Sequence, residues 1–306
     1  MKKNSKEYLG IIGLFTATMI WGGGYVASDI ALETLSSFQT MAIRFFIASI
    51  FTTLVAVKEL KSLTKKELKC GITLGITLFA GFALQTVGLE YTTPSNNAFL
   101  TATNVVLVPF IAFIFCRKKI EKRSLIGAVM TVAGAGVLSL NANFSIGLGD
   151  SLTLLCAVAF AAQIFLTGQY VGKIRPTILN SVQMLTSFVL SIFGCVFEGA
   201  QFQPTQRSMA AVLYLGFIST TITYFLQTIS QKYVDETKTA IILSTESVFA
   251  MVFSVIFLHE NVTSRMIAGS VLILSAVLIS QLKLPQKVSQ KFTDVFTKEE
   301  ESVLTD

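Results

Sequence analysis

The sequence predicts an all-α membrane protein of ten transmembrane helices arranged as two inverted five-helix repeats. Three observations predict it: few charged residues, ten apolar segments of membrane-spanning length, and a motif that occurs twice. Of the 306 residues, 52% are hydrophobic and only 14% are charged, whereas a soluble domain carries about 25% charged residues. The chain lacks the polar surface that water would require, so lipid is its expected environment.

The ten apolar segments each have roughly 18–24 residues, the length at which a helix crosses a hydrocarbon core of about 30 Å. They are too long, and alternate too little, to be strands of a membrane barrel. We place them at 9–31, 37–57, 70–90, 95–116, 124–141, 149–170, 177–199, 208–231, 238–258 and 264–283.

The basic residues predict the orientation of these segments. With the N-terminus in the cytoplasm, every Lys and Arg falls in a cytoplasmic segment except Arg44, Arg207 and Arg265, as the positive-inside rule requires. We therefore expect a multi-pass protein of the cell (cytoplasmic) membrane with cytoplasmic N- and C-termini. The net charge of +6 lies in these connectors rather than on one face, so no nucleic-acid partner is indicated.

The repeated motif divides the chain. Leu84-Gln85-Thr86 recurs as Leu226-Gln227-Thr228, and the same offset pairs Asn104 with Glu246. An odd number of spans per copy inverts the second copy in the membrane. The predicted domains are a first repeat at 9–141, a second, inverted repeat at 149–283 and a cytoplasmic tail at 284–306. Inverted repeats place a substrate site between the halves, near the midplane.

Polar residues inside these spans are costly in lipid and tend to face the bundle interior. Several recur at helical spacing, which puts them on one face. The candidates for substrate contact are Trp21, Tyr25, Gln85, Asn97, Thr101, Asn104, Gln163, Tyr224, Gln227, Thr245 and Glu246. They occupy six predicted helices and predict one polar cavity with aromatic walls. The alternative is that these side chains form hydrogen bonds between helices, as Ser, Thr, Asn and Gln commonly do.

Glu246 is the costliest of these residues, and Arg44 is the only basic residue in the interior of a predicted span, away from its ends. Three interpretations stay open. Glu246 binds a cationic group of the substrate, it carries a coupling proton because burial favours its neutral form, or it forms a structural pair with Arg44. Gly22-Gly23-Gly24 in the first span likewise indicates either a bend beside the cavity or close helix packing.

Motifs for other functions are absent from the sequence. There is no Walker loop and no Gly-x-Gly-x-x-Gly fingerprint, so no nucleotide is expected to drive the protein. His259 is the only histidine, and the four cysteines are far apart in sequence, which indicates neither a zinc site nor a redox pair. No cofactor and no catalytic centre are therefore expected.

Several short motifs, taken in order, resemble a known family. Trp21-Gly22-Gly23-Gly24-Tyr25, Ala42-Ile43-Arg44-Phe45, Leu243-Ser244-Thr245-Glu246 and Leu258-His259-Glu260-Asn261 are similar to those of EamA-type members of the drug/metabolite transporter superfamily. The resemblance covers about residues 9–283. It implies ten helices in two inverted repeats, alternating access, and in most members export of small metabolites, amino acids among them.

Two positions depart from the family pattern. Ser247 stands where the family often has Pro, and His259 stands where it usually has Gly. The first change predicts a straighter ninth helix, because proline kinks a helix. The chain also lacks the basic pair that sugar-phosphate members use, so Arg44 alone favours a zwitterionic, cationic or neutral substrate.

These observations together predict a secondary active transporter that exports amino acids or related small metabolites across the cytoplasmic membrane by alternating access. Its expected partners are membrane lipid, a small-molecule substrate and, in one interpretation, a coupling proton. The alternatives are a membrane-embedded lipid-modifying enzyme, for which no nucleophile–base or metal constellation is visible, and a non-transporting receptor or scaffold.

Overall fold

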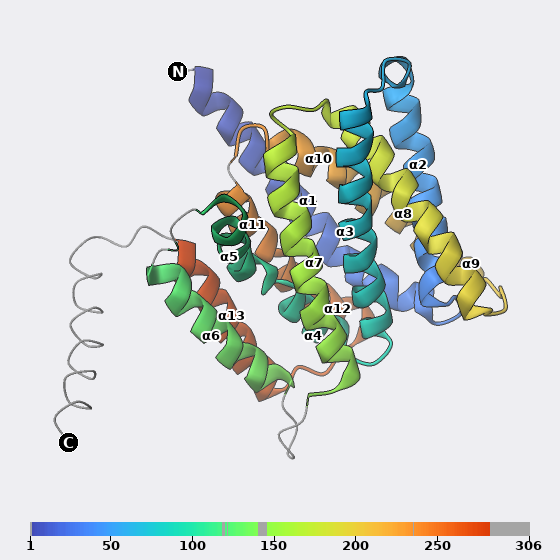
Figure 1. Cartoon of the computed structure of the whole chain (residues 1–306). Coiled ribbons are helices and arrows are strands. Elements are labelled where there is room, and N and C mark those ends of the chain that lie inside the picture. Colours follow the sequence, from blue (N-terminus) through green and yellow to red (C-terminus); the bar gives the residue numbers. More distant parts are fainter. Residues whose placement is uncertain (1, 118–119, 121, 140–145, 235, 282–306) are drawn as a thin grey trace.

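A computed structural model describes the chain except for residues 1, 118–119, 121, 140–145, 235 and 282–306, and every element in the described part is helical (Figure 1). In chain order the elements are α1 (Lys2–Leu32), α2 (Ser37–Leu60), α3 (Lys65–Leu89), α4 (Pro94–Thr101), α5 (Asn104–Cys116), α6 (Lys122–Ser139), α7 (Leu148–Tyr170), α8 (Pro176–Glu198), α9 (Gln206–Leu213), η1 (Tyr214–Ile222), α10 (Thr223–Ser230), α11 (Glu236–Ser244), α12 (Glu246–Leu258) and α13 (Ser264–Gln281). The predicted tail at 284–306 lies outside the described residues.

Eight segments in the described part of the chain are helical, long and apolar enough to cross a membrane. They are Lys6–Leu32, Ser37–Leu60, Lys65–Leu89, Pro94–Cys116, Leu148–Tyr170, Pro176–Glu198, Gln206–Ser230 and Lys238–Leu258. The other two predicted segments, 124–141 and 264–283, correspond to shorter apolar helices at Leu125–Leu138 and Ser264–Ala276. The chain is thus an all-helical, multi-pass membrane protein.

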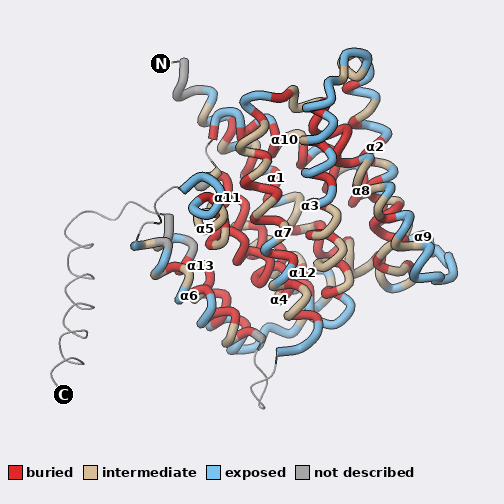
Figure 2. The backbone as a smooth tube through the Cα atoms, viewed as in Figure 1, coloured by how far each residue is buried: buried red, intermediate tan, exposed pale blue. Residues whose placement is uncertain are grey.

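The distribution of side chains is that of a protein surrounded by lipid. Large apolar side chains cover the outside, and Phe115 and Phe197 are 74% and 89% exposed. Polar side chains such as Asn97 and Gln163 are buried instead, and the buried backbone runs through the middle of the bundle (Figure 2). A soluble protein rarely exposes apolar surface on this scale.

Helices from the two ends of the sequence pack against each other. α1 contacts α10, η1 and α12, α2 contacts α8, and α3 contacts α7 and α8, while α6 and α13 form a pair at one edge (Figure 1). α1 is one continuous helix through Gly22-Gly23-Gly24. A Cβ at Gly22 would lie 2.4 Å from Cβ of Phe249, so this glycine permits close packing of α1 on α12 rather than a bend.

Two spans are interrupted near their centres. The Pro94–Cys116 span breaks between α4 and α5 at Ala102 and Thr103, and the Lys238–Leu258 span breaks between α11 and α12 at Thr245. Each threonine hydroxyl donates to the carbonyl three residues back, Thr103 to Leu100 and Thr245 to Ile242, at 2.7 Å. The backbone N–H of each threonine bonds to the same carbonyl.

This tightened turn explains why the ninth predicted span is interrupted at Thr245 and is not one regular helix. Side-chain hydroxyls that bond to the backbone compete with the regular helical ladder and bend it. The serine at Ser247 therefore does not make this span one continuous helix, since Thr245 interrupts it without a proline. As a result α5 begins at Asn104 and α12 begins at Glu246, the pair that the repeated motif relates.

The Gln206–Ser230 span contains a π-helix, η1, of nine residues. The hydroxyl of Thr221 donates to the carbonyl of Gly216, five residues back, at 2.9 Å, which fits the wider π-helical turn. π-helical turns are rare and often occur at functional sites. This one carries Ser219 and Thr220, both of which contact residues of the predicted site.

Candidate functional site

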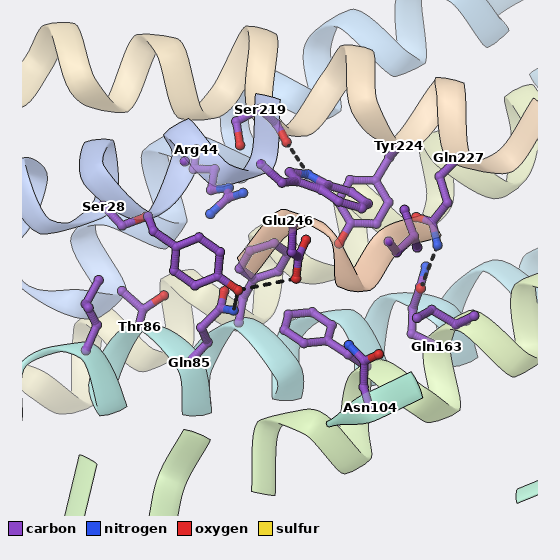
Figure 3. A pocket seen from close by; sticks show the side chains of 18 residues that line it. Ser28, Arg44, Gln85, Thr86, Asn104, Gln163, Ser219, Tyr224, Gln227 and Glu246 are labelled. Carbon is purple, nitrogen blue, oxygen red and sulfur yellow. Dashed lines mark hydrogen bonds between the residues drawn. The ribbon is translucent and has the colours of Figure 1, made fainter. Parts of the chain in front are cut away.

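A cavity lies in the middle of the bundle, among α1, α2, α3, α5, α7, η1, α10, α11 and α12. Its empty space is about 650 Å³ when the solvent at its open end is included. Nine of the residues predicted from the sequence line it: Trp21, Tyr25, Arg44, Gln85, Asn104, Gln163, Tyr224, Gln227 and Glu246. Helices that are distant in sequence therefore bring most of the predicted residues to one place (Figure 3).

Three predicted residues lie outside this lining. Asn97 donates to the carbonyl of Gln85 at 3.1 Å and to the hydroxyl of Thr153 at 2.9 Å. Thr101 accepts from Nε2 of Gln85 at 3.2 Å. The hydroxyl oxygens of Thr245 and of Thr18 on α1 lie 3.3 Å apart. These three form contacts between helices, the role that the sequence left open for them.

Glu246 lies at the centre of the cavity, at the first residue of α12 (Figure 3). Its Oε1 accepts from the hydroxyl of Tyr25 at 3.4 Å, and that hydroxyl in turn accepts from Nε2 of Gln85 at 3.0 Å. These two hydrogen bonds connect α12, α1 and α3. The first bond is long, so most of the hydrogen-bonding capacity of the Glu246 carboxyl group stays available to a ligand.

Arg44 reaches the same cavity from α2 and is only 4% exposed. Its Nε donates to the hydroxyl of Thr220 at 2.6 Å, and its guanidinium carbon lies 4.0 Å from the ring centre of Phe82. Arg44 forms no ion pair with Glu246 or with any other residue that the structure describes. Neutral groups hold the guanidinium in place, and its two terminal nitrogens are left without a carboxylate.

Aromatic side chains form the walls of the cavity. The ring centres of Trp21 and Tyr224 are 5.3 Å apart, and those of Phe82 and Phe160 are 5.2 Å apart. Nε1 of Trp21 donates to the carbonyl of Ser219 in η1 at 2.8 Å (Figure 3). The π-helical segment thereby orients both Trp21 and, through Thr220, Arg44.

Several lining residues were not among the predicted site residues. They are Gly24, Ser28, Phe82, Thr86, Leu89, Phe160, Ile164, Ser219 and Leu243. The internal repeat contains a signal for five of them, since the repeat offsets relate them to predicted site residues: Gly24 to Gln163, Phe82 to Tyr224, Phe160 to Trp21, Ile164 to Tyr25 and Leu243 to Thr101. Ser219 has no such signal, because its place depends on the π-helix. Among the described residues, no group of three or more His, Cys, Asp or Glu side chains is arranged to hold a metal ion.

The family model of EamA-like transporters matches residues 8–140 and 147–281. The chain belongs to the EamA-like transporter family. An uncharacterized transporter of Archaeoglobus fulgidus is 36% identical over 279 residues, covering 91% of this chain and 88% of the relative. The uncharacterized transporter YetK of Bacillus subtilis is 24% identical over 300 residues, covering 92% and 89%. The chain is thus a membrane transporter, as the sequence motifs predicted.

A solved crystal structure has the same fold as this EamA-like transporter. It superposes with a TM-score of 0.68, covers 89% of this chain and 96% of the other, and is 15% identical in sequence. A likeness at this identity concerns the arrangement of the helices only. The chemistry of the cavity has to be argued from the side chains of this chain.

Proposed function

We propose that this EamA-like transporter is a secondary active transporter that exports amino acids or related small zwitterionic metabolites. In this proposal the chain forms ten transmembrane helices in two inverted five-helix repeats, at 9–141 and 149–283. The repeats alternate between an inward-open and an outward-open packing around one site between them. Substrate binding shifts the equilibrium between these two packings only by the difference between its affinities for them.

One observation carries the choice of substrate: a buried base and a buried acid face the same cavity without pairing with each other. Buried charges need a partner, because their removal from water is costly. Arg44 has no carboxylate partner among the described residues, and Glu246 has one long bond from Tyr25. A zwitterion supplies both missing partners, with its carboxylate at Arg44 and its ammonium group at Glu246.

The two interrupted spans support the proposal of two related repeats. Asn104 and Glu246 correspond at the repeat offset, each begins a new helix after a break, and both line the cavity. Discontinuous helices at the midplane are a common way for transporters to build a substrate site. The direction of transport is inferred from the family resemblance, in which export predominates.

The first test is counterflow of labelled metabolites into proteoliposomes that contain the purified protein. We expect uptake of one or more labelled zwitterionic amino acids when the vesicles are preloaded with the same unlabelled compound. A panel of amino acids, amines, carboxylic acids and nucleosides identifies the class. Flux for amines or carboxylic acids alone would contradict the zwitterion, and no flux for any compound with folded protein would favour a receptor or scaffold.

The proposed orientation, with both termini in the cytoplasm, has its own test. The test uses two variants that each carry a single cysteine, Gln203→Cys and Lys61→Cys. Gln203 and Lys61 are exposed and lie at opposite ends of the bundle, after α8 and after α2. In intact cells we expect a membrane-impermeant thiol reagent to label the cysteine at Gln203 and to label the one at Lys61 only after the cells are opened. The reverse pattern would invert the orientation.

A further inference from the structure

Beyond one end of the cavity lies a group of five buried amide side chains, which we call the amide cluster. Its members are Gln163 on α7, Asn180 and Gln183 on α8, Gln227 on α10, and Gln231 just after α10. The least buried of them, Gln231, is 6% exposed. Gln163 and Gln227 also line the cavity, so the cluster begins at the proposed substrate site.

Four of the five amides are joined in two pairs, and the fifth bonds to a backbone carbonyl. Nε2 of Gln227 donates to Oε1 of Gln163 at 3.4 Å (Figure 3), and Nε2 of Gln183 donates to Oδ1 of Asn180 at 2.7 Å. Nε2 of Gln231 donates to the carbonyl of Ile164 at 3.3 Å. These bonds use only a part of the donors and acceptors that the amides carry.

Each member of the amide cluster keeps one amide atom without a partner among the described residues. These atoms are Nε2 of Gln163, Nδ2 of Asn180, Oε1 of Gln183, Oε1 of Gln227 and Oε1 of Gln231. Exchanging nitrogen and oxygen in both amides of the Gln163–Gln227 pair reverses their bond and still leaves one atom of each unpaired. Buried polar groups are almost always hydrogen-bonded to protein or ordered water, so we expect ordered water or a polar ligand at these five atoms.

The amide cluster also points toward one face of the membrane. Gln231 follows the last turn of α10, and a Cβ on Gly168 of α7 would lie 3.9 Å from Nε2 of Gln231 and 3.3 Å from Cβ of Glu236. Glu236 begins α11 at the end of the bundle where α1 also starts (Figure 1). The missing side chain at Gly168 therefore lets α7 pack closely against the start of α11, beside the amide cluster.

Ion pairs join the segments around this end. Nε of Arg175, in the turn between α7 and α8, lies 2.7 Å from Oε1 of Glu67 on α3. Nζ of Lys238 on α11 lies 2.6 Å from Oε1 of Glu7 on α1. Both pairs link a helix of the first half of the chain to a segment of the second half. Separation of the halves at this face would have to break them.

We infer that the amide cluster is the closed half of the translocation route, which leads from the cavity between α7, α8 and α10 to the face where α7 and α10 end. In the closed packing its unpaired amide atoms bind ordered water. When the halves separate at this face, the same atoms meet the polar groups of the passing substrate. The inference rests on the proposed transport function, but the route itself can be tested without a substrate.

The test uses a cysteine as a probe of access by water. Thr167 lies on α7 one turn beyond Gln163, is 1% exposed, and has a hydroxyl without a partner among the described residues. Cys70, Cys116, Cys156 and Cys195, which form no disulfide in the structure, are replaced by Ala, and Thr167→Cys is added. We expect a small, permanently charged methanethiosulfonate to modify this cysteine in the purified, folded protein.

Two glycine variants test whether this route determines how fast the cysteine at Thr167 is modified. Gly168→Leu places a side chain against Glu236 and Gln231 and should slow modification of the cysteine at Thr167 by about tenfold, since tightly packed interiors resist added volume. Gly172→Leu is the matched control, because a Cβ there meets nothing within 4 Å, and it should leave the rate unchanged. A cysteine at Ser191, which is equally buried on α8 but outside the amide cluster, should stay unmodified.

Failure of the route and failure of the transport proposal give different results. No modification at Thr167, equal modification at Ser191, or no effect of Gly168→Leu would each overturn the route, whatever the substrate is. If counterflow identifies a substrate, Gly168→Leu should lower its flux about tenfold while its binding constant stays unchanged, because Gly168 does not line the cavity. Weakened binding with normal modification would contradict the separation of site and route.

Discussion

Replacement of Glu246 by Gln is expected to weaken binding of the zwitterionic substrate by about 10- to 100-fold, which corresponds to the loss of about 1.5–3 kcal/mol of a charge-assisted hydrogen bond. Gln keeps the size of Glu and can still accept from Tyr25, whose hydroxyl lies 3.4 Å from Oε1 of Glu246. Folding should therefore be retained. Calorimetric binding to the purified protein, together with counterflow, measures the effect.

A substrate analogue separates the two functional interpretations of Glu246. If the carboxylate binds the ammonium group, Glu246→Gln should weaken binding of the amino acid but not of the matching 2-hydroxy acid. Loss of the pH dependence of transport with unchanged binding would instead assign a coupling proton to Glu246. Glu90→Gln is the matched control, since Glu90 accepts from Ser37 at 2.6 Å and lies outside the cavity lining.

The structural interpretation of Glu246 predicts a different outcome. If Arg44 and Glu246 held the two halves together as an ion pair, Glu246→Gln would misfold and Arg44→Gln would partly rescue it. The two side chains form no ion pair in the described part of the chain. We therefore expect a folded single variant and no rescue, as measured by thermal unfolding in detergent.

Replacement of Arg44 by Gln is expected to abolish recognition of the substrate carboxylate and to weaken binding by about 10- to 100-fold, because charge-assisted hydrogen bonds contribute about 1.5–3 kcal/mol. Binding of the corresponding amine, which lacks the carboxylate, should be unchanged. Arg44→Lys should be intermediate at best, since Lys keeps the charge but loses the planar group that stacks on Phe82 and binds a carboxylate with two parallel bonds.

Arg44→Gln also has an expected effect on the unfolding temperature. A buried cation without a carboxylate partner destabilises the fold, so Arg44→Gln should unfold at the same temperature as the parent protein or at a higher one. Arg207→Gln is the control for loss of an arginine, because Arg207 is 62% exposed and pairs with Glu33 at 3.3 Å. A strongly lowered unfolding temperature for Arg44→Gln alone would assign Arg44 a structural role.

Three polar residues of the fourth predicted span illustrate what the sequence alone cannot predict. Asn97, Thr101 and Asn104 share one face of a regular helix, and all three were predicted to meet the substrate. The helix is interrupted at Ala102 and Thr103. Asn104 then lines the cavity, while Asn97 and Thr101 bond to neighbouring helices. Periodicity identifies a face only as long as the helix stays regular.

The sequence by itself determined the class of the protein, the location of most membrane helices, and the small set of polar and aromatic residues inside them. These follow from the chain alone, because lipid excludes uncompensated polar groups and a spanning helix needs a minimum length. Nine of the predicted residues meet at one cavity for the same reason.

Only the tertiary structure decided the partners of the two charged residues. Arg44 bonds to Thr220 because a π-helical turn brings that hydroxyl to it, and Glu246 meets Tyr25 because α1 packs closely on α12 at Gly22. Neither contact follows from spacing along the chain, since each depends on the register between two helices. That register leaves the acid and the base of this transporter unpaired in one cavity, and the substrate proposal rests on it.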